Sequence, residues 1–457
     1  MKVQLVSIRP TPAAEEAGRA SLTPELLAAT GARYSRSNDG LDVIISKIDP
    51  ENLDKSVDGI FKMIDYGHQS IADMAPVSLF IDGISMWLAY LVWAQVPTAG
   101  GQESSTRYLE FTENELLSPE ELGISAEHAE DWKAKMSRSL KHYNLMLNMW
   151  AKHGEANPNE TRIPSELLND PSSKAQKAVA RMQRNYAFDR ARYFLPVAMR
   201  TNMMLVMSAR AWVQLSQWLL SHPLKEARTL GEKAVAELQL VTPRLHRHAT
   251  EKPSFKSGHI DEFNQAHRIP VFGRAISAEP FLEVMTPAGL RPADYAQALR
   301  HHDNRYAYLG DALKRTAVRF GWEGIAFAEI RDLNRHRTGN KYCPQVPVGI
   351  YTALDQANME IRLALKDPIL DSVETMTAGL NLYDQNVHEH VYWYILGTEF
   401  YFEHTTTADK FIYEAELRTG TGAHYRYAKH LHDALELWYQ RFPSTKGLVL
   451  EGSAEPE

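Results

Sequence analysis

Residues 325–337 read Ile-Ala-Phe-Ala-Glu-Ile-Arg-Asp-Leu-Asn-Arg-His-Arg. A short apolar segment therefore leads directly into three cationic or cationisable side chains, Arg335, His336 and Arg337. Burying such groups without a partner costs several kcal/mol, so an anionic group is their natural neighbour. We predict a strand at 325–330, because the segment is short and partly β-branched or aromatic. An anion site is expected after it.

The triplet also has a plainer interpretation. It could lie in a solvated turn, or it could form structural ion pairs with Glu329 and Asp332. The order of the surrounding motifs favours the anion site.

Composition restricts the class of protein. At 457 residues the chain is too long for one ordinary domain, so two domains are expected. A net charge of -7 argues against a general nucleic-acid binder, which is usually basic. The single cysteine, Cys343, permits no intrachain disulfide and fits a reducing cytoplasm. The N-terminus lacks a signal-peptide pattern, and no apolar run reaches the roughly 18 residues of a membrane helix.

Hydrophobic periodicity predicts a chain rich in helices. Apolar residues recur every three or four positions in five segments: 175–193, 201–220, 225–240, 293–319 and 423–439. The methionine-rich stretch 199–207 is expected to be a core helix. Further strands are expected at 2–8 and 77–81. Turn-forming residues between 150 and 175 predict a loop or insertion.

The chain has two halves with the same order of parts. Each half has a short apolar strand, a polar segment, a long insertion and a helix pair rich in Arg and His. Residues 251–280 are polar and rich in turn-forming residues, so we take them as the linker between modules 1–250 and 281–457. This arrangement predicts a diverged tandem duplication.

The first half carries the motifs of a known enzyme family. In chain order they are Gly67-His68-Gln-Ser, then Gln102-Glu-Ser-Ser-Thr-Arg107-Tyr, then Ala191-Arg192-Tyr-Phe-Leu-Pro, then Ser208-Ala-Arg210. Together they resemble the flavin-dependent thymidylate synthases, whose signature is Arg-His-Arg, a short gap and Ser-x-Arg-Tyr. The resemblance extends from Met1 to Pro243.

The two halves depart from the family pattern in complementary ways. Where the family has Arg-His-Arg, the first half has Trp93-Ala-Gln-Val, and Leu219 stands in place of a helical arginine. The second half keeps Arg335-His336-Arg337. Its Glu416-Leu-Arg418-Thr, with Gly422, His424 and Arg426, resembles the family's final substrate-binding helix and turn. Its Ser-x-Arg is replaced by Tyr342-Cys-Pro-Gln. Each half therefore keeps what the other has lost.

The resemblance implies a specific chemistry. Such an enzyme uses FAD, with NADPH and methylenetetrahydrofolate as cosubstrates, to methylate C5 of dUMP or a related pyrimidine nucleotide. No protein nucleophile is needed, because the cofactor carries the difficult chemistry. Arginine suits the protein's task, since its guanidinium is a permanent cation with bidentate donors for phosphates and for an electron-rich ring.

The resemblance also assigns roles to individual residues. Arg418 would be catalytic, because a cation there can stabilise the anionic pyrimidine as C5 gains nucleophilic character. The cofactor-binding residues would be Arg335, His336, Arg337, Arg210 and His424. The substrate-binding residues would be Ser105, Arg107, Arg192 and Glu103. Residues of the two halves would meet in one cleft, without a metal.

The expected fold is α+β. It would contain two tandem modules of this family, each a mixed β-sheet flanked by long helices. Because a family enzyme is a homotetramer of single modules, a duplicated chain is expected to be a cytoplasmic homodimer. Its partner would be a nucleotide substrate, and neither nucleic acid nor a membrane is expected.

Three alternatives stay open. Neither half has a complete signature, so the chain could be a catalytically silent or regulatory protein that binds a flavin or a nucleotide. The same scaffold could also act on a different nucleotide. The third alternative is a metal site at His388-Glu389-His390 with Glu403 and His404, although residues two apart on a helix point in different directions.

Overall fold

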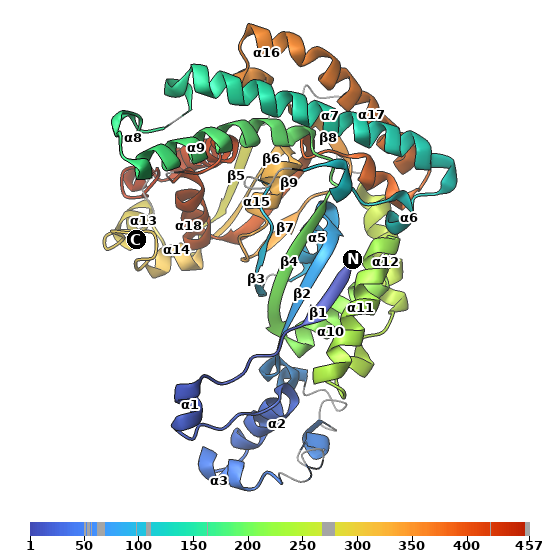
Figure 1. Cartoon of the computed structure of the whole chain (residues 1–457). Coiled ribbons are helices and arrows are strands. Elements are labelled where there is room, and N and C mark those ends of the chain that lie inside the picture. The colour runs from blue at the N-terminus through green and yellow to red at the C-terminus, as the bar shows by residue number, and fades with distance from the viewer. Residues whose placement is uncertain are drawn as a thin grey trace. The chain divides into compact units, whose positions relative to one another are not determined.

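The computed structural model (Figure 1) describes the chain except for residues 50, 51, 53, 54, 56, 62–68, 97, 107–110, 162, 267–278, 421 and 453–457. The chain divides into two compact units. Unit 1 comprises Met1–Ser104, Leu117–Ile124 and Ala198–Glu262, and unit 2 comprises Ser105–Leu116, Ser125–Val197 and Phe263–Glu457.

Unit 1 is built on a four-stranded sheet in the order β1-β2-β4-β3. The strands are β1 (Lys2–Leu5), β2 (Pro76–Ser85), β3 (Gly100–Glu103) and β4 (Arg200–Ser208). The larger helices are α2 (Pro24–Tyr34), α5 (Met86–Gln95), α10 (Ala209–Leu220), α11 (Lys225–Val241) and α12 (Pro253–Ala266), whose last residues belong to unit 2. Shorter helices are α1 (Pro12–Glu16), α3 (Leu41–Ser46), α6 (Pro119–Leu122) and the 3₁₀ helix η1 (Gln69–Met74).

Unit 2 contains a second sheet in the order β5-β6-β9-β7, with β8 also paired to β9. The strands are β5 (Pro280–Met285), β6 (Ala317–Ala326), β7 (Asn340–Tyr342), β8 (Pro347–Ile350) and β9 (Thr398–Thr407). The helices are α7 (Ala126–Ala156), α8 (Ser165–Asn169), α9 (Ser173–Ala191), α13 (Pro292–Ala298), α14 (Asp311–Arg315), α15 (Phe327–Leu333), α16 (Met359–Ala364), α17 (Lys366–Asp384), α18 (Ala408–Thr419) and α19 (Tyr425–Arg441).

The two sheets share a strand order, apart from the additional strand β8. In each, the second strand shifts register near its end, between Asp82 and Ile84 in β2 and between Trp322 and Ile325 in β6. The second strand leads into a helix (α5 or α15), and the last strand leads into a helix pair (α10–α11 or α18–α19). This common topology agrees with the predicted order of parts, while the tandem duplication itself stays a prediction.

The described strand pairs are all antiparallel, so the prediction of mixed sheets is wrong in this respect. Strands β2 and β3 do run in the same direction, because each is antiparallel to β4. Strand β4 lies between them and supplies the hydrogen bonds to both.

The long insertion of the first half packs in unit 2, not with the rest of predicted module 1–250. Helix α7 lies beside α17 (Figure 1). Asp371 of α17 accepts a hydrogen bond from Arg138 at 2.9 Å, and its other carboxylate oxygen is 2.7 Å from Nε2 of His142. Trp132 donates to the carbonyl of Tyr392 at 2.8 Å. These contacts join α7 to the second half, so the packing does not follow the boundary at 250.

The predicted helix at 201–220 is wrong in its first half. Residues 200–208 form β4, and only α10 is helical. Met203, Leu205 and Met207 alternate with more exposed residues, which is the two-residue period of a strand. Hydrogen bonds to β2 and β3 on both sides outweigh the helix propensity of methionine.

Three other predictions also need correction. The predicted strand 325–330 ends at Ala326, and helix α15 follows from Phe327. The predicted helix 293–319 consists of α13, α14 and the first residues of β6. The predicted linker 251–280 contains helix α12, and its residues 267–278 lie outside the described part.

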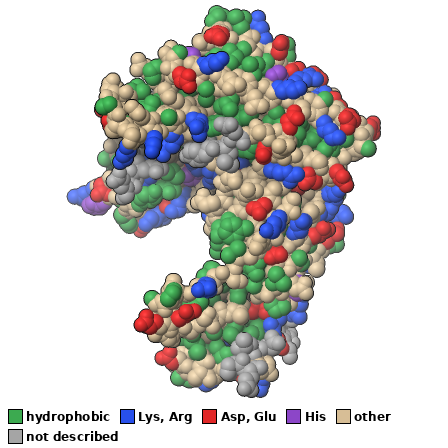
Figure 2. Space-filling view, in the orientation of Figure 1, with side chains coloured by type: hydrophobic (Ala, Val, Ile, Leu, Met, Phe, Trp, Pro, Cys, Tyr) green, Lys and Arg blue, Asp and Glu red, His purple; other side chains and the backbone are tan. Residues whose placement is uncertain are grey.

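The other predicted elements are confirmed. The strands at 2–8 and 77–81 correspond to β1 and β2, and the helices at 175–193, 225–240 and 423–439 correspond to α9, α11 and α19. Among the described residues, no helix is both long and apolar enough to span a bilayer. Figure 2 shows Lys and Arg side chains interspersed with Asp and Glu on the visible face.

Candidate functional site

The cationic triplet follows the end of a buried helix. All seven residues of α15 are buried, and this anchors the chain up to Leu333. Beyond the helix, His336 is only 7% exposed, while Arg335 and Arg337 are half-buried. The Nε atom of Arg335 is buried and has no hydrogen-bond partner among the described residues. An orphaned guanidinium nitrogen of this kind suits an anionic ligand.

Arg418, in the last turn of α18, contacts the triplet directly. Its Nε donates to Nε2 of His336 at 2.7 Å, and its Nη2 donates to the carbonyl of Asp332 at 2.7 Å. Arginine keeps its protons in proteins, so Nε2 of His336 must accept, and the imidazole is neutral with its proton on Nδ1. Burial also favours the neutral imidazole, and it lowers the pKa of His336 to about 3. Arg418 and His336, which the resemblance assigned to one site, are therefore in contact within unit 2.

Further polar groups surround this contact. The carbonyl of His336 accepts a hydrogen bond from Nζ of Lys341. Glu414, one turn before Arg418, is buried and has Oε2 at 3.0 Å from Nδ1 of His404. The ring of Tyr413 meets that of His336 edge-on, with the centroids 6.4 Å apart. The site is thus a compact group of cations and aromatic rings that includes the buried acid Glu414.

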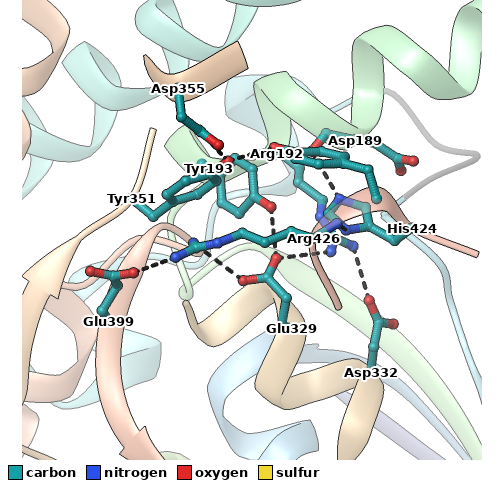
Figure 3. A network of polar contacts seen from close by, with 11 residues as sticks. Asp189, Arg192, Tyr193, Glu329, Asp332, Tyr351, Asp355, Glu399, His424 and Arg426 are labelled. Atoms are coloured by element: carbon teal, nitrogen blue, oxygen red, sulfur yellow. Dashed lines mark hydrogen bonds and ion pairs between the residues drawn. The ribbon is translucent and has the colours of Figure 1, made fainter. Parts of the chain in front are cut away.

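A second polar network is centred on the carboxylate of Glu329 in α15 (Figure 3). Arg192, which is 1% exposed, donates to Glu329 at 3.4 Å and to Asp332 at 3.1 Å. The hydroxyl of Tyr193 donates to the same oxygen of Glu329 at 2.7 Å. Burial raises the pKa of Glu329, and the guanidinium groups of Arg426 and Arg192 oppose that rise.

Arg426 completes this network from α19. It pairs with Glu329 at 3.5 Å and with Glu399 at 2.5 Å, and its guanidinium lies 3.1 Å from the ring centroid of Tyr351. Sequence reasoning placed Arg426 in the motif of Arg418 but did not predict its contacts with Glu329, Glu399 and Tyr351. The available signal was Glu329 itself, because an acid within a buried apolar run requires a cation from elsewhere.

The network bears on two sequence interpretations. Glu329 and Asp332, which were possible partners of the triplet, both hold Arg192. Arg192 was assigned to the substrate, yet here it is a buried structural cation that joins 3₁₀ helix η4 (Arg192–Phe194) to α15. Its substrate-binding role stays a prediction.

The remaining predicted residues lie in different places. His424 caps α19, since its Nδ1 accepts from the amide of Arg426 at 3.2 Å, and its Nε2 lies 3.1 Å from the carbonyl of Asp189. Ser105 is half-buried in unit 2. Arg107 lies outside the described residues, as do Gly67 and His68.

Two predicted residues belong to unit 1. Arg210, in the first turn of α10, pairs with Asp73 at 2.9 Å on a partly exposed surface. Glu103, at the end of β3, accepts a hydrogen bond from the indole of Trp93 at 3.1 Å. Both residues have local partners, and their ligand roles stay predictions.

The metal alternative is not supported by the local geometry. No group of three His, Cys, Asp or Glu side chains arranged for a metal occurs in the described part of the chain. Residues 388–393 form a 3₁₀ helix, η7 (His388–Trp393), and both ring nitrogens of His390 face backbone carbonyls, of Val387 at 3.0 Å and of Gln345 at 3.2 Å.

The fold and the site together define the class of this protein: an α+β chain with a cation-rich site at the end of a buried helix. Residues 19–244 match the family model described as thymidylate synthase complementing protein. The UPF0159 protein Ta1429 of Thermoplasma acidophilum is 24% identical over 250 residues, which cover 49% of this chain and 50% of that protein. The chain thus spans about half the length of this curated relative. The match to the thymidylate synthase complementing protein family is thus confined to residues 19–244, just under half of the chain.

Solved structures of two proteins match about half of this chain. The UMP/dUMP methylase PolB from Streptomyces cacaoi, bound with 5-Br dUMP, is 16% identical and has a TM-score of 0.33, with coverage of 54% of this chain and 93% of that chain. The flavin-dependent thymidylate synthase ThyX from Helicobacter pylori, complexed with FAD and dUMP, is 15% identical and has a TM-score of 0.32, with coverage of 55% and 100%.

Proposed function

We propose that the chain is a flavin-dependent, thymidylate synthase-like enzyme. It transfers a one-carbon unit from methylenetetrahydrofolate to C5 of dUMP or a related pyrimidine nucleotide, with reduced flavin as the hydride donor. The observation that carries this proposal is the hydrogen bond from Arg418 to His336, which joins two separate family motifs in one site. The family match over residues 19–244 supports it.

The triplet fits the anionic part of FAD. The buried Nε of Arg335 lacks a hydrogen-bond partner among the described residues, and a pyrophosphate oxygen would supply one. Arg335 and Arg337 would hold this group, and their permanent charges would balance it. Bound FAD would supply the carbon-transfer and hydride-transfer chemistry.

Arg418 acts on the pyrimidine. Two hydrogen bonds fix its guanidinium, one to His336 and one to the carbonyl of Asp332, and both acceptors are neutral. Its positive charge therefore remains available to stabilise negative charge that develops on the ring as C5 becomes nucleophilic. Fixed orientation matters because a preorganised cation needs no rearrangement during the reaction.

The other roles belong to the same proposal. Ser105, Arg107 and Glu103 would contact the nucleotide, while Arg210 and His424 would contact the cofactor. Arg192 would reach the nucleotide only by exchanging its carboxylate partners, Glu329 and Asp332. NADPH would reduce the flavin, and the working protein would be a cytoplasmic homodimer.

The test is tritium release from C5 of labelled dUMP by the purified full chain. The assay contains FAD, NADPH and methylenetetrahydrofolate. We expect release by the wild type and at least a roughly hundredfold loss in Arg418→Ala, the size typical for removal of a charge-stabilising group. Arg441→Ala, an exposed arginine at the end of α19, is the matched control and should retain full activity.

Two outcomes would reject methylation of dUMP as the activity. A colourless protein without thermal stabilisation by FAD or dUMP would point to a silent relative. A yellow protein that binds dUMP without tritium release would point to a regulatory role or to another nucleotide. One observation favours this second outcome. Arg192, which was assigned to the substrate, is already neutralised by the carboxylates of Glu329 and Asp332.

A further inference from the structure

Unit 1 has a position that corresponds to the triplet of unit 2. His336 is the tenth residue after the end of β6 at Ala326, and Gln95 is the tenth residue after the end of β2 at Ser85. Arg418 and Leu219 are likewise each the eleventh residue of α18 and α10. Unit 1 therefore presents Gln95, Val96 and Leu219 where unit 2 presents the charged and imidazole groups of its site.

A pocket of about 520 Å³ lies beside Gln95 and Val96 of unit 1. Gln95 and Val96 line it from the end of α5, Leu215 and Trp218 from α10, and Phe255 and His259 from α12. Its volume is in the range of small-molecule sites. All of these residues belong to unit 1, so the pocket is formed within one compact unit.

The charge of this pocket differs from that of the triplet site. None of the described residues lining it is Lys or Arg. Its acidic lining residue is Glu262, whose pKa burial raises. A phosphate would therefore meet no permanent cation and one acidic group, which disfavours an anionic ligand.

The walls of the pocket suit a planar ring. The ring of Trp218 lies 5.1 Å from the imidazole of His259 and 4.7 Å from that of His222, measured between centroids, and these two contacts hold the indole in place. Phe255 is 38% exposed at the edge. Base rings stack on such side chains. Gln95 and Gln214 add two amides that each offer a donor and an acceptor to the edge of a heterocycle.

We propose that this pocket binds an uncharged planar heteroaromatic molecule, namely a nucleobase or a nucleoside without phosphate. Stacking on Trp218 would supply most of the affinity, and the glutamine amides would select a ring with donors and acceptors at its edge. The site is separate from the one proposed for catalysis, and its existence does not depend on that function.

The experiment compares adenosine and uridine with their 5′-monophosphates by isothermal titration calorimetry on the full chain. The background variant Arg335→Ala/Arg418→Ala removes binding at the triplet site. We expect at least one nucleoside to bind saturably in this background, with its monophosphate roughly tenfold weaker or more. Trp218→Ala should weaken nucleoside binding roughly tenfold.

A gain-of-charge variant makes the test independent of folding defects. Gln95 is exposed, so Gln95→Arg leaves the core intact and places a cation at the pocket. We expect this variant to bind the monophosphate more tightly than the nucleoside. The proposal is overturned if neither nucleoside binds, if Trp218→Ala leaves the affinity unchanged, or if the unmodified pocket prefers the monophosphate.

Discussion

His336 acts in this structure as a neutral hydrogen-bond acceptor. A histidine between two arginines would be expected from sequence to add a third charge, yet its Nε2 accepts from Arg418 and its side chain is buried. Its contribution is therefore to orient the guanidinium of Arg418. Arg418, which carries the charge, lies in α18. His336, which positions it, lies after α15, far from α18 in sequence.

The neutral state of His336 predicts a pH-dependent stability. In the unfolded chain its pKa is near 6.5, whereas in the fold it is about 3. Between these values the unfolded state binds a proton that the folded state does not, so this contribution is present above pH 6.5 and is lost as the pH falls towards 3. His336→Gln keeps a hydrogen-bond acceptor but does not titrate. We therefore expect its free energy of unfolding to fall less steeply with decreasing pH than that of the wild type, with slopes that differ by up to about 1 kcal/mol per pH unit.

Urea unfolding of both proteins at several pH values between 4 and 7 measures this difference. Since other groups titrate in the same range, only the difference between the two proteins is informative. Identical pH slopes would show that His336 is not held neutral by the fold. Tritium release should also survive in His336→Gln and fall in His336→Ala, because only the former can hold Arg418.

The buried carboxylate of Glu329 predicts a large loss of stability on truncation. It faces Arg192, Arg426 and the hydroxyl of Tyr193. Glu329→Ala would leave two buried guanidinium groups with less compensation, which costs about 3–5 kcal/mol. Glu360→Ala, at an exposed position of α16, should cost less than about 0.5 kcal/mol. Equal unfolding midpoints for the two variants would contradict the network.

At the scale of elements, the sheets explain where sequence reasoning failed. Hydrophobic periodicity correctly located helices such as α11, which buries one apolar face and exposes the other. It failed at β4, because methionines that alternate in the middle of a sheet also satisfy a three- or four-residue spacing over a short stretch. It failed at Ala326, because the change from strand to helix occurs inside one continuous apolar run.

The close approach of β6 and β9 predicts a strict requirement for glycine. A Cβ at Gly321 would lie 2.1 Å from the carbonyl oxygen of Phe402. Since backbone cannot move without breaking the ladder, Gly321→Ala should destabilise the fold by more than about 2 kcal/mol. Gly40→Ala is the control, because nothing lies within 4 Å of the added atom. Similar denaturation midpoints would mean that the register of β6 with β9 is wrong.

At the scale of the whole molecule, sequence reasoning captured the α+β class and the two sheets, and it assigned Arg418 and His336 to one site. These depend on local patterns and on motif order, which a single sequence contains. The pairing of Arg192 with its two carboxylate partners could not be predicted from the sequence. These partners lie in a helix 137 to 140 positions away, so the pairing leaves no local pattern. The packing of α7 in unit 2 was missed for the same reason.

The unequal charges of the two units predict one flavin per chain. Only unit 2 has a cationic triplet after the helix that follows its second strand, whereas unit 1 has Ala94, Gln95 and Val96 there. Because a pyrophosphate requires permanent cations, we expect about one FAD per chain at saturation. Arg335→Ala should reduce this occupancy, while Gln95→Ala, its counterpart control in unit 1, should not. Flavin absorbance after heat release, divided by protein from amino-acid analysis, measures the ratio. Two flavins per chain, or loss of flavin in Gln95→Ala, would assign a second working site to unit 1 and contradict the division of roles.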